Sequence, residues 1–363
     1  MNTQLGIIEG FYGEPWSWEE RGGYAAFLKE HGFSFYIYAP KADAYMRKKW
    51  REPFPADLEE KLSRLSAQCR ASGIEFGVGF SPYEIYLSPF NEEVKGLLHN
   101  RIDAFNRIGV DKFGLLMDDM KGDFPELAKR QIEIVNWVAA RSTAKQLIFC
   151  PTYYSLDPVL EKLFGKKPEG YLEQLGKELD PKVRLFWTGE LVCSKGYSEE
   201  HLRATAGVLG RKPFLWDNYP VNDGPRMCKF LHLRPMTGRP SVIGQWLAGH
   251  SVNPMNQPTL SKIPLLTLKL SYELGAAYRP EEAFLKAAGL VTCGEMALQL
   301  EKDLPNFMDR GLDQLTEAER GRMKQVYAPY LVSRVNWTAA AAREVTDWLG
   351  GRYTVTKDLF LTQ

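Results

Sequence analysis

The stretch "KFGLLMDDMKGD" (residues 112–123) runs through six largely apolar positions and then sets two aspartates side by side, Asp118 and Asp119. An apolar run without strict alternation is typical of a parallel strand buried on both faces, so we expect a strand over 112–117. Two like charges at the end of a buried strand are costly, because each carboxylate resists desolvation and raises the pKa of the other. The pair therefore belongs either to a surface turn or to the mouth of a pocket.

Strand-like and helical stretches alternate along the sequence both before and after residues 112–117. A helix is expected over 91–108, closed by Gly109, and another is expected to begin near Pro125. Short β-prone runs recur before residue 275, and most are joined by amphipathic stretches that start on a capping residue or end on glycine. The eight strand candidates are 5–10, 34–39, 74–80, 112–117, 146–150, 183–187, 213–216 and 241–246.

Eight strand–helix units over roughly 250 residues predict a (β/α)8 barrel, an α/β fold of about this length. We place the barrel at residues 1–275 and a small helical segment at 276–363, where the strand-like runs stop. The last crossover is irregular, and its prolines predict a long loop over 219–240. A doubly wound open sheet is the alternative, but no GxGxxG fingerprint follows the first strand.

Composition narrows the class of protein. The 363 residues carry a formal net charge of +1 and no basic run, which argues against nucleic acid as a partner. No window reaches the ~18 apolar residues that a membrane span needs. The five cysteines are scattered without a CxxC pair, so we expect free thiols, no metal site and no cofactor. The N-terminus lacks the pattern of a secretory signal, and the chain is predicted to be cytoplasmic.

Unusual polar and aromatic residues follow the predicted strand ends. In (β/α)8 barrels the chemistry sits on the loops that leave the C-terminal ends of the strands. These loops hold "EGFYGEPW" (9–16), "PKADAYMRKKWR" (40–51), "DDMKGD" (118–123), "PTYY" (151–154), "TGE" (188–190), "DNYPVND" (217–223) and "VNPM" (252–255). A random scatter of polar residues would not track the strand ends, so the aspartate pair is predicted to lie at a pocket mouth.

In this order the motifs resemble the catalytic domain of glycoside hydrolase family 84, over roughly residues 5 to 260. That family contains β-N-acetylglucosaminidases, among them protein O-GlcNAc hydrolases and enzymes historically called hyaluronidases, and its fold is a (β/α)8 barrel. The resemblance implies a retaining, exo-acting hydrolase of terminal β-linked GlcNAc whose substrate is a GlcNAc-bearing glycoside or glycoprotein. Whether the physiological aglycone is a protein, a glycosaminoglycan fragment or a small glycoside stays open.

The resemblance also implies roles for individual residues. It assigns Asp118 to the acetamido group of the substrate, Asp119 to acid–base work and Tyr154 to the forming oxazoline oxygen. The implied substrate-binding residues are Asn218, which would brace Asp118, Cys150 and Trp216 at the acetamido methyl, and Gly10, Lys41, Asp223 and Asn253 at the sugar hydroxyls.

The chemistry of the pair can be reasoned separately. A retaining glycosidase normally uses two carboxyls about 5–5.5 Å apart on opposite sides of the bond, which neighbouring residues cannot readily provide. A 2-acetamido group offers its own carbonyl oxygen as nucleophile, so one aspartate can orient that group while the other protonates the leaving oxygen. An ionised Asp118 is expected to raise the pKa of Asp119 toward that of a useful acid.

Two other classes of function stay open. A glycan-binding barrel without activity would conflict with the intact Asp118, Asp119 and Tyr154. A metal-dependent hydrolase or lyase would need further carboxylates or histidines at strand ends, and the five histidines show no such placement.

The sequence departs from the family pattern at two positions. Ala42 stands where the family usually has an acidic residue, and Tyr153 stands where glutamate is frequent, so the sequence does not predict which aglycone is preferred.

Overall fold

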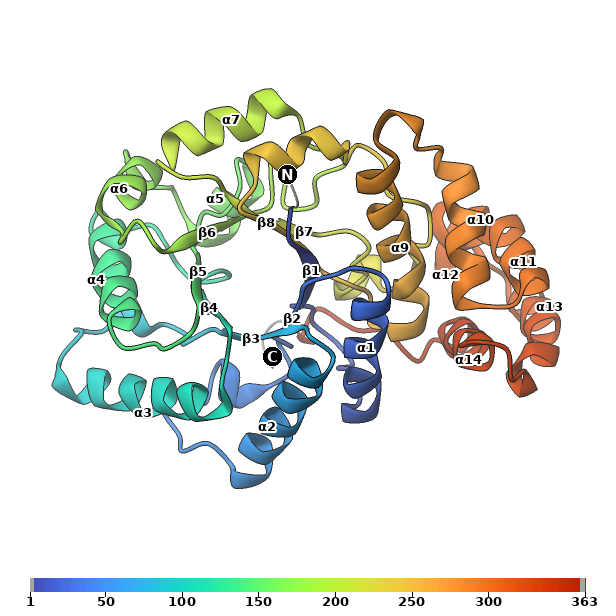
Figure 1. The fold of residues 1–363 in the computed structure, drawn as a ribbon, viewed down its shortest axis with the longest axis horizontal. Helices are drawn as coiled ribbons and strands as arrows, with labels where there is room; N and C mark the ends of the chain where they lie inside the picture. The colour runs from blue at the N-terminus through green and yellow to red at the C-terminus, as the bar shows by residue number, and fades with distance from the viewer. Residues whose placement is uncertain (1–2, 360–362) are drawn as a thin grey trace.

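The computed structural model describes residues 3–359 and 363 and shows a closed eight-stranded parallel barrel. Neighbouring strands pair in sequence order, and β8 closes the ring by pairing with β1, which excludes the open sheet. Figure 1 shows the strands as a central ring with helices around it. The strands are β1 (Leu5–Glu9), β2 (Phe35–Tyr38), β3 (Glu75–Phe80), β4 (Lys112–Leu116), β5 (Gln146–Cys150), β6 (Arg184–Trp187), β7 (Phe214–Asp217) and β8 (Gly249–Val252).

Helices connect the strands on the outside of the barrel, and the elements described after β8 are all helical. The barrel helices are α1 (Trp18–Glu30), α2 (Ala56–Ala71), α3 (Glu92–Ile108), α4 (Leu127–Ala139), α5 (Val159–Phe164), α6 (Tyr171–Glu178), α7 (Glu199–Val208), α8 (Gly224–Met227) and α9 (Pro258–Leu274). Beyond them come α10 (Pro280–Val291), α11 (Gly294–Pro305), α12 (Gly311–Gln314), α13 (Glu317–Tyr327) and α14 (Thr338–Leu349). None of the helices within the described part of the chain is long and apolar enough to cross a membrane.

The eighth strand was predicted in the wrong place. Residues Ser241–Trp246 form a 3-10 helix, η3, whose Ile243 packs in a small apolar cluster against the barrel. The strand is the polar segment that follows, "GHSV", which is fully buried. Its polar groups find partners inside the protein: His250 Nε2 lies 3.1 Å from Asp217, and Ser251 Oγ donates to the Leu215 carbonyl at 2.6 Å. Satisfied polar groups can be buried, so this strand lacks the apolar signal of the others.

The C-terminal helices attach to the barrel through α9. Glu344 of α14 accepts hydrogen bonds from the amides of Thr259 and Leu260, both at 2.8 Å, and so caps the first turn of α9. The amine of Lys262 lies 3.7 Å from the centre of the Trp337 ring. Figure 1 shows α10–α14 gathered on this side of the barrel, away from the strands.

Close packing of the barrel can be tested at Gly6 of β1. A Cβ at this position would overlap the carbonyl oxygen and ring of Phe35 on β2, so we expect Gly6→Ala to cost about 1–3 kcal/mol of unfolding free energy. Gly23 is the matched control, because it is exposed in α1 and a Cβ there meets no atom within 4 Å. Gly23→Ala should stabilise by about 0.5–1 kcal/mol. Urea unfolding of both variants measures the difference, and equal effects would contradict the packing argument.

Candidate active site

The C-terminal ends of the strands surround a cavity of about 160 Å³. Each of the ten residues predicted from the sequence lines it, so the structure brings the whole set together. The lining consists of Gly10, Tyr12, Lys41, Asp118, Asp119, Cys150, Tyr154, Thr188, Val192, Cys193, Trp216, Asn218, Val221, Asp223 and Asn253. The aspartate pair therefore lies in a pocket and not in a surface turn.

The two aspartates share one cation. Lys41, on the loop after β2, places Nζ 2.5 Å from Asp118 Oδ2 and 3.7 Å from Asp119 Oδ2. Asp119 has φ of +56°, a left-handed conformation that non-glycine residues rarely adopt and that tends to mark functional sites. This turn directly after the strand keeps the consecutive carboxylates within reach of the same ammonium group.

Asp118 keeps one acceptor unused. Its Oδ1 is buried and, among the described residues, has no hydrogen-bond partner, while Oδ2 binds Lys41. A buried carboxylate oxygen without a partner is unfavourable by a few kcal/mol, so its persistence calls for a ligand group. A donor such as an amide N–H would satisfy it.

Asp119 is surrounded by donors and positive charge. Tyr12 donates to its Oδ2 at 2.8 Å, and Tyr154 lies 3.4 Å from Oδ1. Burial opposes ionisation, but the charges of Lys41 and Arg47, with the two tyrosine hydroxyls, hold the pKa of Asp119 below its usual value. The expectation that the pKa of Asp119 is raised toward that of a useful acid is therefore wrong for the free protein, because the nearby cations and hydroxyls lower it.

Sequence reasoning missed four residues of the cavity lining, Thr188, Val192, Cys193 and Val221. It also missed Tyr12 and Arg47, which act on Asp119. Both lie inside quoted motifs, "EGFYGEPW" and "PKADAYMRKKWR", so their loops carried a signal although neither residue received a role. Arg47 is buried, donates to Ser81 at 3.2 Å and packs on the ring of Tyr83. The separation of Arg47 and Asp119 along the sequence does not predict that the charge of Arg47 acts on Asp119.

A second group of contacts lies on the β7–β8 side. Asp223 Oδ2 accepts from the Tyr12 amide at 2.8 Å. Asn253 accepts from the Gly10 amide at 3.2 Å and donates to Asn218 Oδ1 at 3.0 Å. Burial raises the pKa of Asp223 to about 6, with the Asp119 charge acting in the same direction and the Tyr12 amide acting against it.

Asn218 does not hold Asp118 in this structure. Its Oδ1 accepts from the indole of Trp216 at 3.0 Å, and its Nδ2 donates to the Val192 carbonyl at 2.9 Å. The contact to Asp118 is made instead by Lys41. Asn218 therefore fixes the indole of Trp216, which walls the cavity, and not the carboxylate.

Within residues 3–359 and 363 no group of three or more His, Cys, Asp or Glu side chains is arranged to hold a metal ion. The described cysteines are free thiols, and two of them, Cys150 and Cys193, line the cavity. Burial raises the pKa of the Cys150 thiol well above its usual value, which suits an apolar wall and not a nucleophile.

Comparison with known proteins places these residues in a family context. Residues 5–307 match the sequence model of a family described as beta-N-acetylglucosaminidase. The Protein O-GlcNAcase of Rattus norvegicus and that of Mus musculus are each 31% identical to the chain over 278 residues. The match covers 74% of this chain but 30% of either relative, so the chain spans less than a third of their length.

Solved structures agree with this match. A mutant of the Thermobaculum terrenum O-GlcNAc hydrolase superposes with a TM-score of 0.75 at 28% identity, covering 96% of this chain and 82% of that one. The structure of CpGH84B superposes with a TM-score of 0.77 at 27% identity. The match covers 96% of this chain and 66% of the CpGH84B chain. The likeness extends over almost the whole chain, including the C-terminal helices.

The raised pKa of Asp223 gives a testable pH dependence. The sequence predicts that Asp223 binds sugar hydroxyls. Protonation below a pH of about 6 turns one of its acceptor oxygens into a donor and removes the negative charge, which weakens acceptance from hydroxyls. Affinity for an uncharged GlcNAc-derived oxime inhibitor should therefore weaken as pH falls through about 6, by up to about tenfold per pH unit. Calorimetric titration across this range measures it.

Two variants provide the controls for this experiment. Asp223→Asn should bind more weakly and show a flat profile through the same range, and Asp223→Ala should abolish measurable binding. Far-UV circular dichroism and the thermal midpoint establish that each variant is folded. Wild-type affinity in folded Asp223→Ala would remove Asp223 from the sugar-binding residues.

Proposed function

Because the chain belongs to the β-N-acetylglucosaminidase family, glycoside hydrolase family 84, we propose that it is a retaining exo-β-N-acetylglucosaminidase that works by substrate assistance. Its substrate would be a terminal β-linked GlcNAc, as on an O-GlcNAc-modified protein. We propose that the enzyme acts in the cytoplasm. The observation that carries the proposal is the Asp118–Asp119 pair. The pair shares Lys41, and Asp118 keeps a buried oxygen without a partner.

The open acceptor of Asp118 suits the acetamido N–H of the sugar. Accepting that hydrogen bond would orient the acetamido group and increase electron density on its carbonyl oxygen, which then attacks the anomeric carbon. The new C–O bond forms as the glycosidic C–O bond breaks, giving an oxazoline. Tyr154, whose hydroxyl lies near Asp119, is placed to donate to the oxygen of the forming ring.

Asp119 would transfer the protons. In the first step it protonates the leaving oxygen, and in the second it takes a proton from the water that opens the oxazoline, so the anomeric configuration is retained after two displacements. The free protein holds Asp119 ionised, which is the form needed for the second step. For the first step we propose that the bound sugar draws Lys41 onto a hydroxyl and excludes water, which raises the pKa of Asp119.

The size and lining of the cavity support a single sugar as ligand. A volume of about 160 Å³ suits one pyranose ring and not a longer glycan segment. Cys150 and Trp216 supply buried apolar surface for the acetamido methyl, and Asp223 and Asn253 supply acceptor and donor groups for hydroxyls. An exo-acting enzyme needs this combination, since it receives only the terminal residue.

The activity is tested by hydrolysis of an aryl β-N-acetylglucosaminide. Turnover with retention, followed by nuclear magnetic resonance, is the expected result. Binding of GlcNAc-type inhibitors with no turnover of any GlcNAc glycoside would leave a glycan-binding barrel instead. Full activity on the matching glucoside, which has no 2-acetamido group, would contradict substrate assistance.

The two aspartates should separate by leaving group. Asp119→Asn should slow alkyl glycosides by about 10²–10⁴-fold, because alkoxides depart poorly without a proton. It should slow nitrophenyl glycosides far less, because nitrophenolates depart with little help. The measurement is kcat/KM over a series of leaving groups.

Asp118→Asn is the paired variant in this series. It should slow both substrate classes severely, since it weakens the acetamido nucleophile whatever group leaves. The effect should lessen when the acetamido group is fluorinated, because that nucleophile is already poor. Two variants with the same sensitivity to the leaving group would refute the division of roles.

A further inference from the structure

A second cavity, on the outer side of the barrel, holds a buried arginine that the proposed reaction does not use. The space measures about 270 Å³ and is lined by residues of α2, α3 and the loop 50–54. Among the described residues it shares no lining residue with the catalytic cavity. Arg101 of α3 lines the space and is 3% exposed, so its guanidinium is largely removed from solvent.

The guanidinium of Arg101 has only part of the hydrogen bonds that it can make. Nη2 donates to the carbonyls of Trp50 and Glu52, both at 2.8 Å. Nη1 is buried and, within the described part of the chain, has no hydrogen-bond partner. The guanidinium carbon lies over the Phe54 ring, 4.2 Å from its centre. This contact stabilises the positive charge, but it does not replace the oxygen acceptor that a buried N–H group requires.

The positive charge of Arg101 also lacks a close counter-charge. No carboxylate in the part of the chain that the structure describes forms an ion pair with it. The negative charge that acts on it comes from Asp43, whose carboxylate already accepts from the Tyr38 hydroxyl at 2.7 Å and the Tyr45 amide at 3.0 Å. Burial lowers the pKa of Arg101 to about 10, so the group stays charged at neutral pH without the partner that a buried ion needs.

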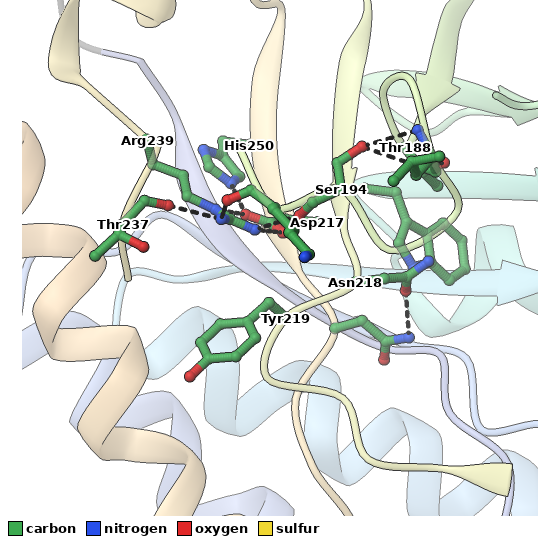
Figure 2. Close-up of polar contacts among 12 residues, drawn as sticks. Thr188, Ser194, Asp217, Asn218, Tyr219, Thr237, Arg239 and His250 are labelled. Atoms are coloured by element: carbon green, nitrogen blue, oxygen red, sulfur yellow. Dashed lines mark hydrogen bonds and ion pairs between the residues drawn. The ribbon is translucent and has the colours of Figure 1, made fainter. Parts of the chain in front are cut away.

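Two other buried arginines have such a partner. Arg21 donates to both carboxylate oxygens of Glu9, from Nε at 2.8 Å and from Nη2 at 2.6 Å. Figure 2 shows Arg239, from the loop before η3, in the same arrangement with Asp217, at 3.0 and 2.8 Å. Arg101 has the burial of these residues but not the carboxylate, so an anion from outside the chain is the partner that its chemistry calls for.

The acidic residues of the cavity do not supply this anion. Glu59 accepts from Arg107 through both carboxylate oxygens, at 3.1 and 3.3 Å. Glu52 lies 3.7 Å from the amine of Lys49. The volume is just below the roughly 300–1,000 Å³ of sites for drug-sized molecules, so it suits a smaller ligand. The apolar part of the lining consists of Trp50, Pro53, Phe54, Leu97 and Ala104.

We propose that this cavity binds a small oxyanion, a carboxylate or phosphate group, that accepts hydrogen bonds from Nη1 of Arg101. Both groups present two or more oxygens to a guanidinium, and hydrogen bonds between ionised partners are the strong ones. The apolar walls beside the arginine suit the organic part of a small acid or phosphate ester. The inference concerns binding alone and does not depend on the proposed hydrolase activity.

The test measures binding of two probes, inorganic phosphate and acetate, which separate the two sources of the oxyanion. We expect calorimetric titration of the wild-type protein, at constant ionic strength in a zwitterionic buffer, to show saturable binding of at least one probe. Arg101→Gln should weaken that binding by about tenfold or more, the scale of one hydrogen bond to a charged group. The matched control is Arg64→Gln, which removes the same charge from an exposed residue of α2 outside the cavity and should keep the wild-type affinity.

Ala104→Leu covers the case in which the glutamine variant does not fold because it no longer holds the carbonyls of Trp50 and Glu52. Ala104 lies one turn after Arg101 on α3 and lines the cavity, so a leucine there occupies the space while the guanidinium stays. It should abolish binding, and far-UV circular dichroism establishes that each variant is folded. Wild-type protein that binds neither probe would overturn the inference. Wild-type affinity in folded Arg101→Gln or Ala104→Leu would overturn it as well, because the anion would then be held elsewhere.

Discussion

The contact of Lys41 with both aspartates is the interaction on which the site depends. Two consecutive carboxylates at a buried strand end are tolerated because a cation from the loop after β2 lies between them. Removing one partner from a buried pair costs about 3–5 kcal/mol, since the other charge is left unpaired. The parallel barrel brings the ends of β2 and β4 to the same rim, so the fold places the lysine beside the two carboxylates.

Buried charged and polar groups behind the cavity are also stabilised by partners inside the protein. On β7 and β8 the buried polar side chains, Asp217, His250 and Ser251, all have partners inside the protein. Burial opposes ionisation of Asp217, but Arg239 and His250 hold its pKa far below its usual value, so it stays charged and keeps its bidentate contact. Buried networks of this kind define one arrangement because a partly satisfied alternative is unfavourable.

The sequence predicted what depends on local pattern. Apolar runs located β1 to β7. The motifs at the strand ends contain eight of the ten predicted cavity residues, and the other two, Cys150 and Trp216, lie within β5 and β7. It misplaced β8, because "GHSV" is buried through polar partners 22 to 36 residues away in the chain, and pattern alone cannot show them. It likewise gave the wrong direction for the pKa of Asp119. That direction is set mainly by Lys41, together with Arg47 and two tyrosine hydroxyls, and only the folded loops determine how close these groups lie to Asp119.

The exposure of the two aspartates bears on their proposed division of roles. The Asp118 side chain is 8% exposed and that of Asp119 is 27% exposed. An acid–base residue must meet the leaving group in the first step and water in the second, and both pass through the open side of the site. A residue that orients the acetamido group needs no contact with water, and burial strengthens its hydrogen bond. The deeper carboxylate therefore suits the orientation of the acetamido group, and the shallower one suits the proton transfers.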